Sequence, residues 1–151
     1  MASAQCKHKG CTKGALFKSD FCWEHIQDKE EYKKEILQLG TDGRINLAGA
    51  NLRAVDLEGT NPEGANLMGA GLKKANLQKA DLWGAKLWQA KLIGAHLQEA
   101  SLEGADLWWA NLEAANLEGA HLGEPALGKP TLRKLTFQML TFEVPSLTRL
   151  T

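Results

Sequence analysis

Three cysteines and a histidine near the N-terminus are the residues of this chain best suited to chemistry. Four residues separate Cys6 from Cys11, and two separate Cys22 from His25. Two close pairs of sulfur and nitrogen ligands, joined by a short loop, suit the tetrahedral coordination that zinc prefers. The spacing predicts a zinc site in which His25, or the nearby His8, is the fourth ligand. The alternative is three free cysteines and a solvent-exposed histidine.

A zinc ion held by four protein ligands has no open position for water or substrate, so the predicted role of this site is structural. The segment around it is too short to bury a sizeable core, and metal binding would supply most of its folding free energy. Three cysteines cannot all pair with one another, which argues against a disulfide framework.

Lysines and aromatic residues surround these ligands and allow two interpretations. Charge and stacking together would suit a small nucleic-acid contact. Alternatively, the lysines offset the negative charge of zinc-bound thiolates and the rings form the small core of the module. Nearby acidic residues favour the second interpretation. The residues concerned are Lys7, Lys9, Lys13, Lys18, Phe17, Phe21 and Trp23.

Catalytic patterns are not evident elsewhere in the sequence. His96 and His121 are predicted to be solvated, since the sequence suggests no serine, cysteine or carboxylate pair in a pocket beside them. No phosphate-binding loop, metal-hydrolase motif or nucleophile elbow occurs. We therefore expect a protein that is not an enzyme.

The elements that must position these residues begin with a helix. The segment from Trp23 to Leu39 has helical character and is followed by Gly40, a helix-ending residue. We expect this helix and the zinc module to cover the first coil of the repeat that follows.

That repeat has a period of five residues from Ile45 onward. Every fifth residue from Leu47 to Leu122 is leucine except Pro62, and alanine stands two positions earlier in each repeat from Ala65 to Ala120. This period fits neither the 3.6 residues of an α-helical turn nor the two-residue alternation of a strand. Leucine and alanine can both point inward if each repeat makes one side of a square and glycine-rich turns form the corners.

The tandem A-(N/D)-L-x-x pattern resembles the pentapeptide-repeat family. The resemblance covers residues 45 to 124 and implies an all-β solenoid, a right-handed quadrilateral β-helix with four repeats in each coil. Successive coils would stack at the β spacing of about 4.8 Å. Pro62 is predicted to make one irregular side, because proline cannot donate to the ladder.

Stacking in steps of 20 residues brings Met68, Trp88 and Trp108 above one another on an outward face. Trp109 would lie beside them and Trp83 one side earlier. Grouped exposed aromatic residues mark an interaction site more often than scattered apolar residues do. The alternative is that these flat side chains only protect the surface on which they stack.

The chain divides into three predicted segments. Residues 1–44 form the zinc knuckle and capping helix, residues 45–124 the regular repeat, and residues 125–151 a degenerate coil in which larger residues replace alanine. This last segment would be a self-contained cap or a homodimer interface, and an amphipathic helix from Leu132 to Phe142 would serve either. Self-association through this end is also what the family resemblance implies.

Composition limits the remaining functions. Eighteen basic and eighteen acidic residues cancel, so no overall field draws the molecule to nucleic acid or to an anionic membrane. No apolar run is long enough to span a bilayer, and the start lacks a signal-peptide core, so we expect a soluble, cytoplasmic protein. The sequence favours an interaction scaffold for an unidentified protein. The alternatives are nucleic-acid binding through the knuckle, and a DNA-mimicking modulator of type II topoisomerases, which the resemblance suggests.

Overall fold

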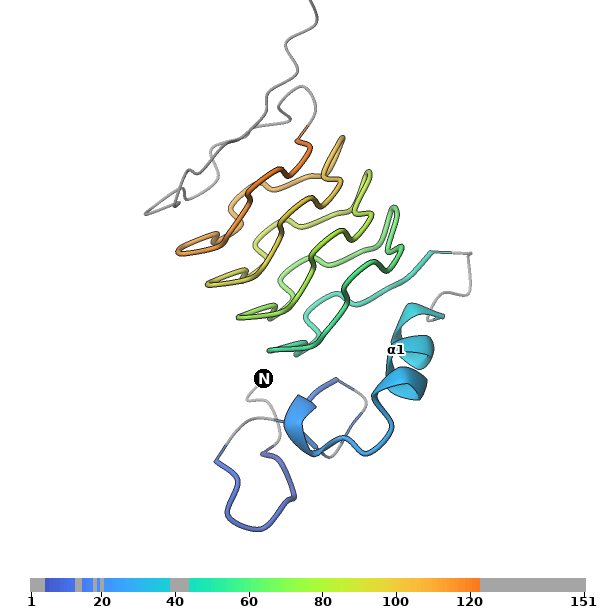
Figure 1. The fold of residues 1–151 in the computed structure, drawn as a ribbon, viewed down its shortest axis with the longest axis vertical. Coiled ribbons are helices and arrows are strands. Elements are labelled where there is room, and N and C mark those ends of the chain that lie inside the picture. The colour runs from blue at the N-terminus through green and yellow to red at the C-terminus, as the bar shows by residue number, and fades with distance from the viewer. Residues whose placement is uncertain (1–4, 13–14, 18, 20, 39–43, 123–151) are drawn as a thin grey trace, which may run out of the picture.

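Stacked four-sided coils with a small module at their N-terminal end make up the molecule (Figure 1). The computed structural model describes residues 5–12, 15–17, 19, 21–38 and 44–122. Single parallel bridges, rather than long strands, join successive coils in this part of the chain. One column runs from Asn46 to Asn66, to Lys86 and to Asp106, in steps of 20 residues. The predicted quadrilateral β-helix and its register are confirmed.

The corners of the coils depend on a left-handed backbone at the second residue after each leucine. At the first corner, Gly49 has a φ of 67° and the amide of Ala50 donates to the carbonyl of Leu47 at 3.0 Å. Glycine takes this conformation without steric penalty. Seven other corners use residues with a side chain, among them Trp109 with a φ of 61°. The preference for glycine at corners is therefore real but not obligatory.

The core consists of the inward leucines and alanines that the repeat predicts. Leu67 and Leu87 are 1% and 0% exposed, and Ala85 is 0% exposed. Each buried leucine contributes about 1.5–3 kcal/mol of hydrophobic free energy relative to an exposed one. Because the columns fill the interior of the coils, the surface carries the features that can recognise other molecules.

Pro62 occupies an inward position and is buried, as the leucines of the other repeats are. In the next repeat, the amide of Leu67 donates to the carbonyl of Lys86 at 2.8 Å. The equivalent acceptor for residue 62 is the carbonyl of Asp81, and no backbone amide of the described residues donates to it. The irregular side predicted here is thus a missing ladder bond rather than a displaced coil.

The predicted helix from Trp23 to Leu39 is wrong in its extent. The structure has a 3₁₀ helix, η1, at Trp23–His25 and a separate α-helix, α1, at Lys29–Leu37. Asp28 begins α1, because its side chain accepts a hydrogen bond from the amide of Glu31 at 2.8 Å. Leu39 and Gly40 lie outside the described residues.

The N-terminal module covers the open edge of the first coil. The amide of Phe17 donates to the carbonyl of Asn51 at 2.8 Å, in the same way that the amide of Leu52 donates to Gly71 in the coil above. The hydroxyl of Tyr32 then donates to the carbonyl of Phe17 at 2.9 Å. An exposed ladder edge would otherwise offer unpaired backbone groups to other chains.

Side chains of α1 and of the loop before it extend the core into the module. Ile36 is fully buried, and Leu16 and Tyr32 are nearly so. Trp23, Ile26 and Leu37 pack against the same cluster while partly exposed. The sequence analysis anticipated the contribution of α1 but not that of Leu16.

The predictions for residues 125–151 lie outside the described residues. Within the described part of the chain, the helices lack the length and apolar character that crossing a membrane requires.

Candidate metal centre and tryptophan face

The four predicted metal ligands come together in the N-terminal module. The ligand atoms of Cys6, Cys11, Cys22 and His25 all lie within 4.8 Å of one another. No disulfide links the three cysteines, and two of them, Cys6 and Cys22, are buried. This cluster can hold a metal ion.

Two short turns place the ligands. In the first, the amide of Cys11 donates to the carbonyl of His8 at 3.0 Å, and Gly10 between them has a φ of 81°. In the second, η1 brings Cys22 and His25 to one side, since a 3₁₀ turn repeats every three residues. The break between η1 and α1, which the sequence analysis missed, therefore belongs to the site.

The distances between ligand atoms suit tetrahedral zinc. Zn–S and Zn–N bonds of about 2.3 and 2.0–2.1 Å place sulfur atoms about 3.8 Å apart and sulfur about 3.5 Å from nitrogen. The Sγ atoms of Cys11 and Cys22 are 3.8 Å apart. The Nδ1 atom of His25 is 3.5 Å from the Sγ atom of Cys6 and 3.3 Å from that of Cys22. Three sulfurs and one nitrogen form the donor set of a known class of structural zinc site.

The surroundings favour the thiolate that a metal requires. Burial raises the pKa of the Cys6 thiol, but hydrogen bonds from the backbone at Cys22 and His8 and from the side chains of His25 and Cys11 lower it by more, to about 6. Thiolate, not thiol, is the metal-binding form of cysteine.

His8 has a different place from the one proposed as an alternative ligand. Its ring stacks on that of His25 with centroids 3.8 Å apart and 7° between the planes. Of the two histidines, His25 is the one in the cluster. Stacking by His8 fixes the orientation of the His25 ring.

A second feature, the tryptophan face, consists of Met68, Trp88, Trp108 and Trp109. The amide of Gly69 donates to the carbonyl of Trp88 at 2.8 Å, and that of Gln89 to Trp108 at 2.9 Å, so these residues stack in register as predicted. Met68, Trp108 and Trp109 are 37%, 45% and 60% exposed, whereas Trp88 is half-buried. The rings of Trp108 and Trp109 meet edge to face, with centroids 6.4 Å apart and 68° between the planes.

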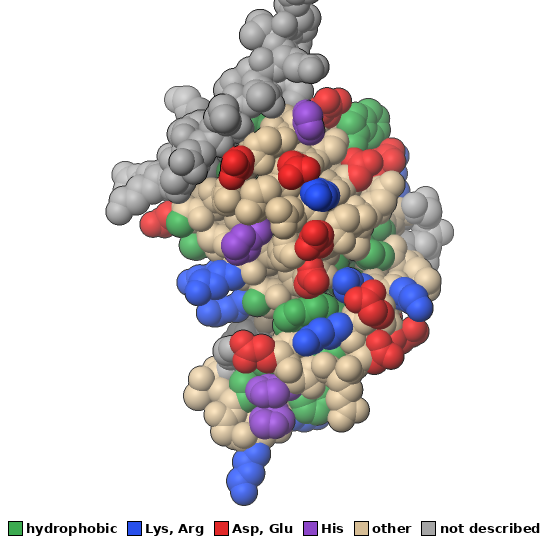
Figure 2. Space-filling view, in the orientation of Figure 1, with side chains coloured by type: hydrophobic (Ala, Val, Ile, Leu, Met, Phe, Trp, Pro, Cys, Tyr) green, Lys and Arg blue, Asp and Glu red, His purple; other side chains and the backbone are tan. Residues whose placement is uncertain are grey.

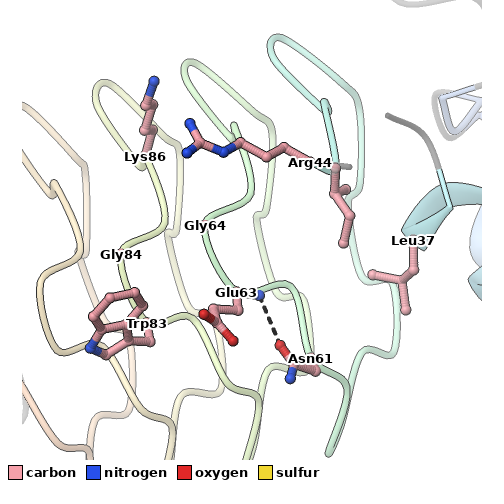
Figure 3. A pocket seen from close by; sticks show the side chains of 9 residues that line it. Leu37, Arg44, Asn61, Glu63, Gly64, Trp83, Gly84 and Lys86 are labelled. Atoms are coloured by element: carbon pink, nitrogen blue, oxygen red, sulfur yellow. Dashed lines mark hydrogen bonds between the residues drawn. The ribbon is translucent and has the colours of Figure 1, made fainter. Parts of the chain in front are cut away.

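Trp83 lies apart from that face, in an open groove of about 740 Å³ (Figure 3). The groove runs from the end of α1, at Leu37, past Arg44 to Glu63 and Lys86 on the coils. Trp83 is 52% exposed there. The predicted surface thus comprises two sites on different sides of the solenoid.

His96 and His121 are exposed, as expected. Contrary to the sequence expectation, His121 has a serine beside it, because the ladder pairs it with Ser101 one coil earlier. Within the described part of the chain, no hydrogen bond between their side chains is present. The pair lacks the orienting contact that a nucleophile and its base require.

Comparisons with known proteins agree with this architecture. The description "Pentapeptide repeats" matches residues 45–84 and 84–119, in eight copies. A pentapeptide repeat protein from Nostoc Pcc 7120 is 40% identical over 60% of this chain and 74% of its own, with a TM-score of 0.57. A pentapeptide repeat protein from the Arabidopsis thaliana thylakoid lumen is 32% identical over 52% of this chain and 55% of its own, with a TM-score of 0.50. No curated protein matches the sequence.

Proposed function

We propose that this chain, which belongs to the pentapeptide-repeat family, is a non-enzymatic scaffold that binds another protein through its tryptophan face. The observation that carries the proposal is the exposure of Trp108 and Trp109 on a surface whose backbone is fixed by the coil ladder. Aromatic residues are enriched among the side chains that dominate binding free energy at protein interfaces. A rigid surface also loses little conformational freedom on binding.

The N-terminal module has a supporting role in this proposal. A zinc ion held by Cys6, Cys11, Cys22 and His25 would stabilise the module, with no open position for chemistry at the metal. The module in turn covers the first coil through Phe17. Removing zinc should therefore loosen the N-terminal end of the solenoid while leaving the tryptophan face folded.

Two alternative functions have weaker support. A DNA-mimicking modulator of topoisomerases needs an acidic surface, whereas residues 45–151 contain ten basic and eleven acidic side chains. Nucleic-acid binding through the module would rest on Lys7 and Lys9, and it predicts binding that weakens steeply with salt and when both become alanine. Inhibition of supercoiling at micromolar protein would revive the first alternative, and salt-sensitive nucleic-acid binding the second.

The test is capture of partners from native lysate by the wild-type protein and by a Trp88→Ser, Trp108→Ser variant, with identification by mass spectrometry. Trp83→Ser is the matched control, because it removes an exposed tryptophan from the other site. The proposal expects a partner that wild type and control retain and the double variant loses. Equal retention by all three proteins would refute it.

A further inference from the structure

The charges of the solenoid are divided along its axis. From Arg44 to Lys91 the chain has seven basic and four acidic residues. Between Leu92 and Leu122 it has five acidic residues and no lysine or arginine: Glu99, Glu103, Asp106, Glu113 and Glu118. Because the coils stack in chain order, this division becomes spatial, and acidic side chains predominate over the coils farthest from the N-terminal module (Figure 2).

The most exposed part of the tryptophan face lies on this acidic end. The Oδ1 atom of Asp106 accepts a hydrogen bond from the amide of Trp108 at 3.0 Å, which holds the carboxylate beside the start of the aromatic pair. Asp106 is exposed and makes no ion pair with another described residue. Two steeply inclined indole rings and an unpaired carboxylate therefore share one corner of the coil.

This combination suits a cationic side chain. The face of an indole ring attracts ammonium and guanidinium groups within about 6 Å. Lysine and arginine can lay their apolar stems along a ring while the charged group reaches a carboxylate. The molecule already contains one such contact, since the Nζ atom of Lys29 lies 5.4 Å from the centroid of the Trp23 ring.

The backbone of Trp109 points the same way. Its φ of 61° is left-handed, a conformation that costs free energy in a residue with a side chain and that glycine takes at eight other corners. The ring is 60% exposed, so burial does little to offset this cost. A binding role accounts for a bulky aromatic residue at this position better than stability does.

We propose that the aromatic corner formed by Asp106, Trp108 and Trp109 binds a basic segment of the partner protein and receives a lysine or arginine side chain beside the indole rings. The inference rests on the proposed function and specifies the chemistry of the partner. The excess of carboxylates on these coils would steer such a segment toward the corner.

Fluorescence anisotropy with two labelled 12-residue peptides tests this inference. One peptide repeats Lys-Leu-Ser four times and the other repeats Glu-Leu-Ser four times. We expect the lysine peptide to bind at least tenfold more tightly than the glutamate peptide, and its affinity to fall as NaCl rises from 50 to 300 mM. An Asp106→Asn, Trp109→Gly variant should bind it about tenfold more weakly than wild type does.

The matched control is an Asp81→Asn, Trp83→Ser variant. Asp81 accepts a hydrogen bond from the amide of Trp83 at 3.1 Å, in the same arrangement, but no second tryptophan follows. This control should bind the lysine peptide as wild type does. A melting temperature near that of wild type excludes unfolding as the cause of any loss.

Equal binding of both peptides, or unchanged binding by the Asp106, Trp109 variant, would overturn the inference. Partner capture that depends on Trp88 and Trp108, without preference for the lysine peptide, would leave the docking surface intact and refute only its basic partner. Capture that ignores both tryptophans would refute the proposed function itself, whichever peptide binds.

Discussion

Replacing Pro62 by leucine should stabilise the solenoid, because it restores the residue that every other inward position of the repeat uses. A leucine amide can donate to the carbonyl of Asp81, which no backbone amide of the described residues reaches now. That hydrogen bond contributes about 1 kcal/mol. One additional buried carbon contributes about 0.8 kcal/mol. Loss of the proline constraint on the unfolded chain costs about 0.4–1 kcal/mol.

The net gain from Pro62→Leu is therefore about 1 kcal/mol, or about 3 °C in melting temperature for a protein of this size. Thermal unfolding followed by circular dichroism in the presence of zinc measures it. Pro62→Ala is the control, since it also restores the donor but buries three fewer carbons than leucine. It should melt about 7 °C below Pro62→Leu. A leucine variant that melts well below wild type would show that this side is not built like the others.

Three further substitutions test other parts of the structure. His25→Ala should abolish stoichiometric zinc binding, measured by elemental analysis, whereas His8→Ala should retain the metal. Tyr32→Phe should cost about 1 kcal/mol of unfolding free energy near neutral pH, because it removes the hydrogen bond to the Phe17 carbonyl. Burial, with the carboxylate nearby, raises the pKa of the Tyr32 hydroxyl, so the native state holds this proton more tightly than the unfolded state. Its contribution should be full below about pH 10 and decline above it, and this decline should be absent in the phenylalanine variant. Trp109→Gly should leave the melting temperature within about 2 °C of wild type, because relief of the left-handed backbone offsets the lost ring contact; a large drop would show that the ring is structural.

The solenoid was predictable from sequence because each repeat reports its own geometry. A leucine every five residues and an alanine two positions before it fix which side chains point inward, and a step of 20 residues then fixes the register. The same arithmetic placed Met68, Trp88 and Trp108 in one column before any coordinates were considered. Regular repeats make long-range contacts readable as local patterns.

The module was harder to predict because its contacts have no period. Helical character from Trp23 onward concealed the break after His25, where the position of a ligand and the Asp28 cap outweigh local propensity. The ladder bond from Phe17 to the first coil also joins residues with no common pattern. Ligand spacing identified the metal cluster, but only coordinates distinguish His25 from His8.

The separation of Trp83 from the other tryptophans shows a similar limit. Sequence arithmetic placed it one side earlier, but the groove around it also depends on Leu37 and Arg44, which precede the repeat. A site formed where an irregular segment meets a regular one cannot be read from either alone.

Site-specific crosslinking tests the central claim most directly. Benzoylphenylalanine would replace Gln89, which lies at the corner one coil before Trp109, or Ala54, which lies on a different side of the first coil. Both are exposed corner residues with matching backbones, at φ values of 57° and 58°. After irradiation in native lysate, the account predicts a crosslinked partner at position 89 and none at position 54. Equal crosslinking at both positions, or crosslinking at position 54 alone, would contradict the claim that the tryptophan face is the binding surface.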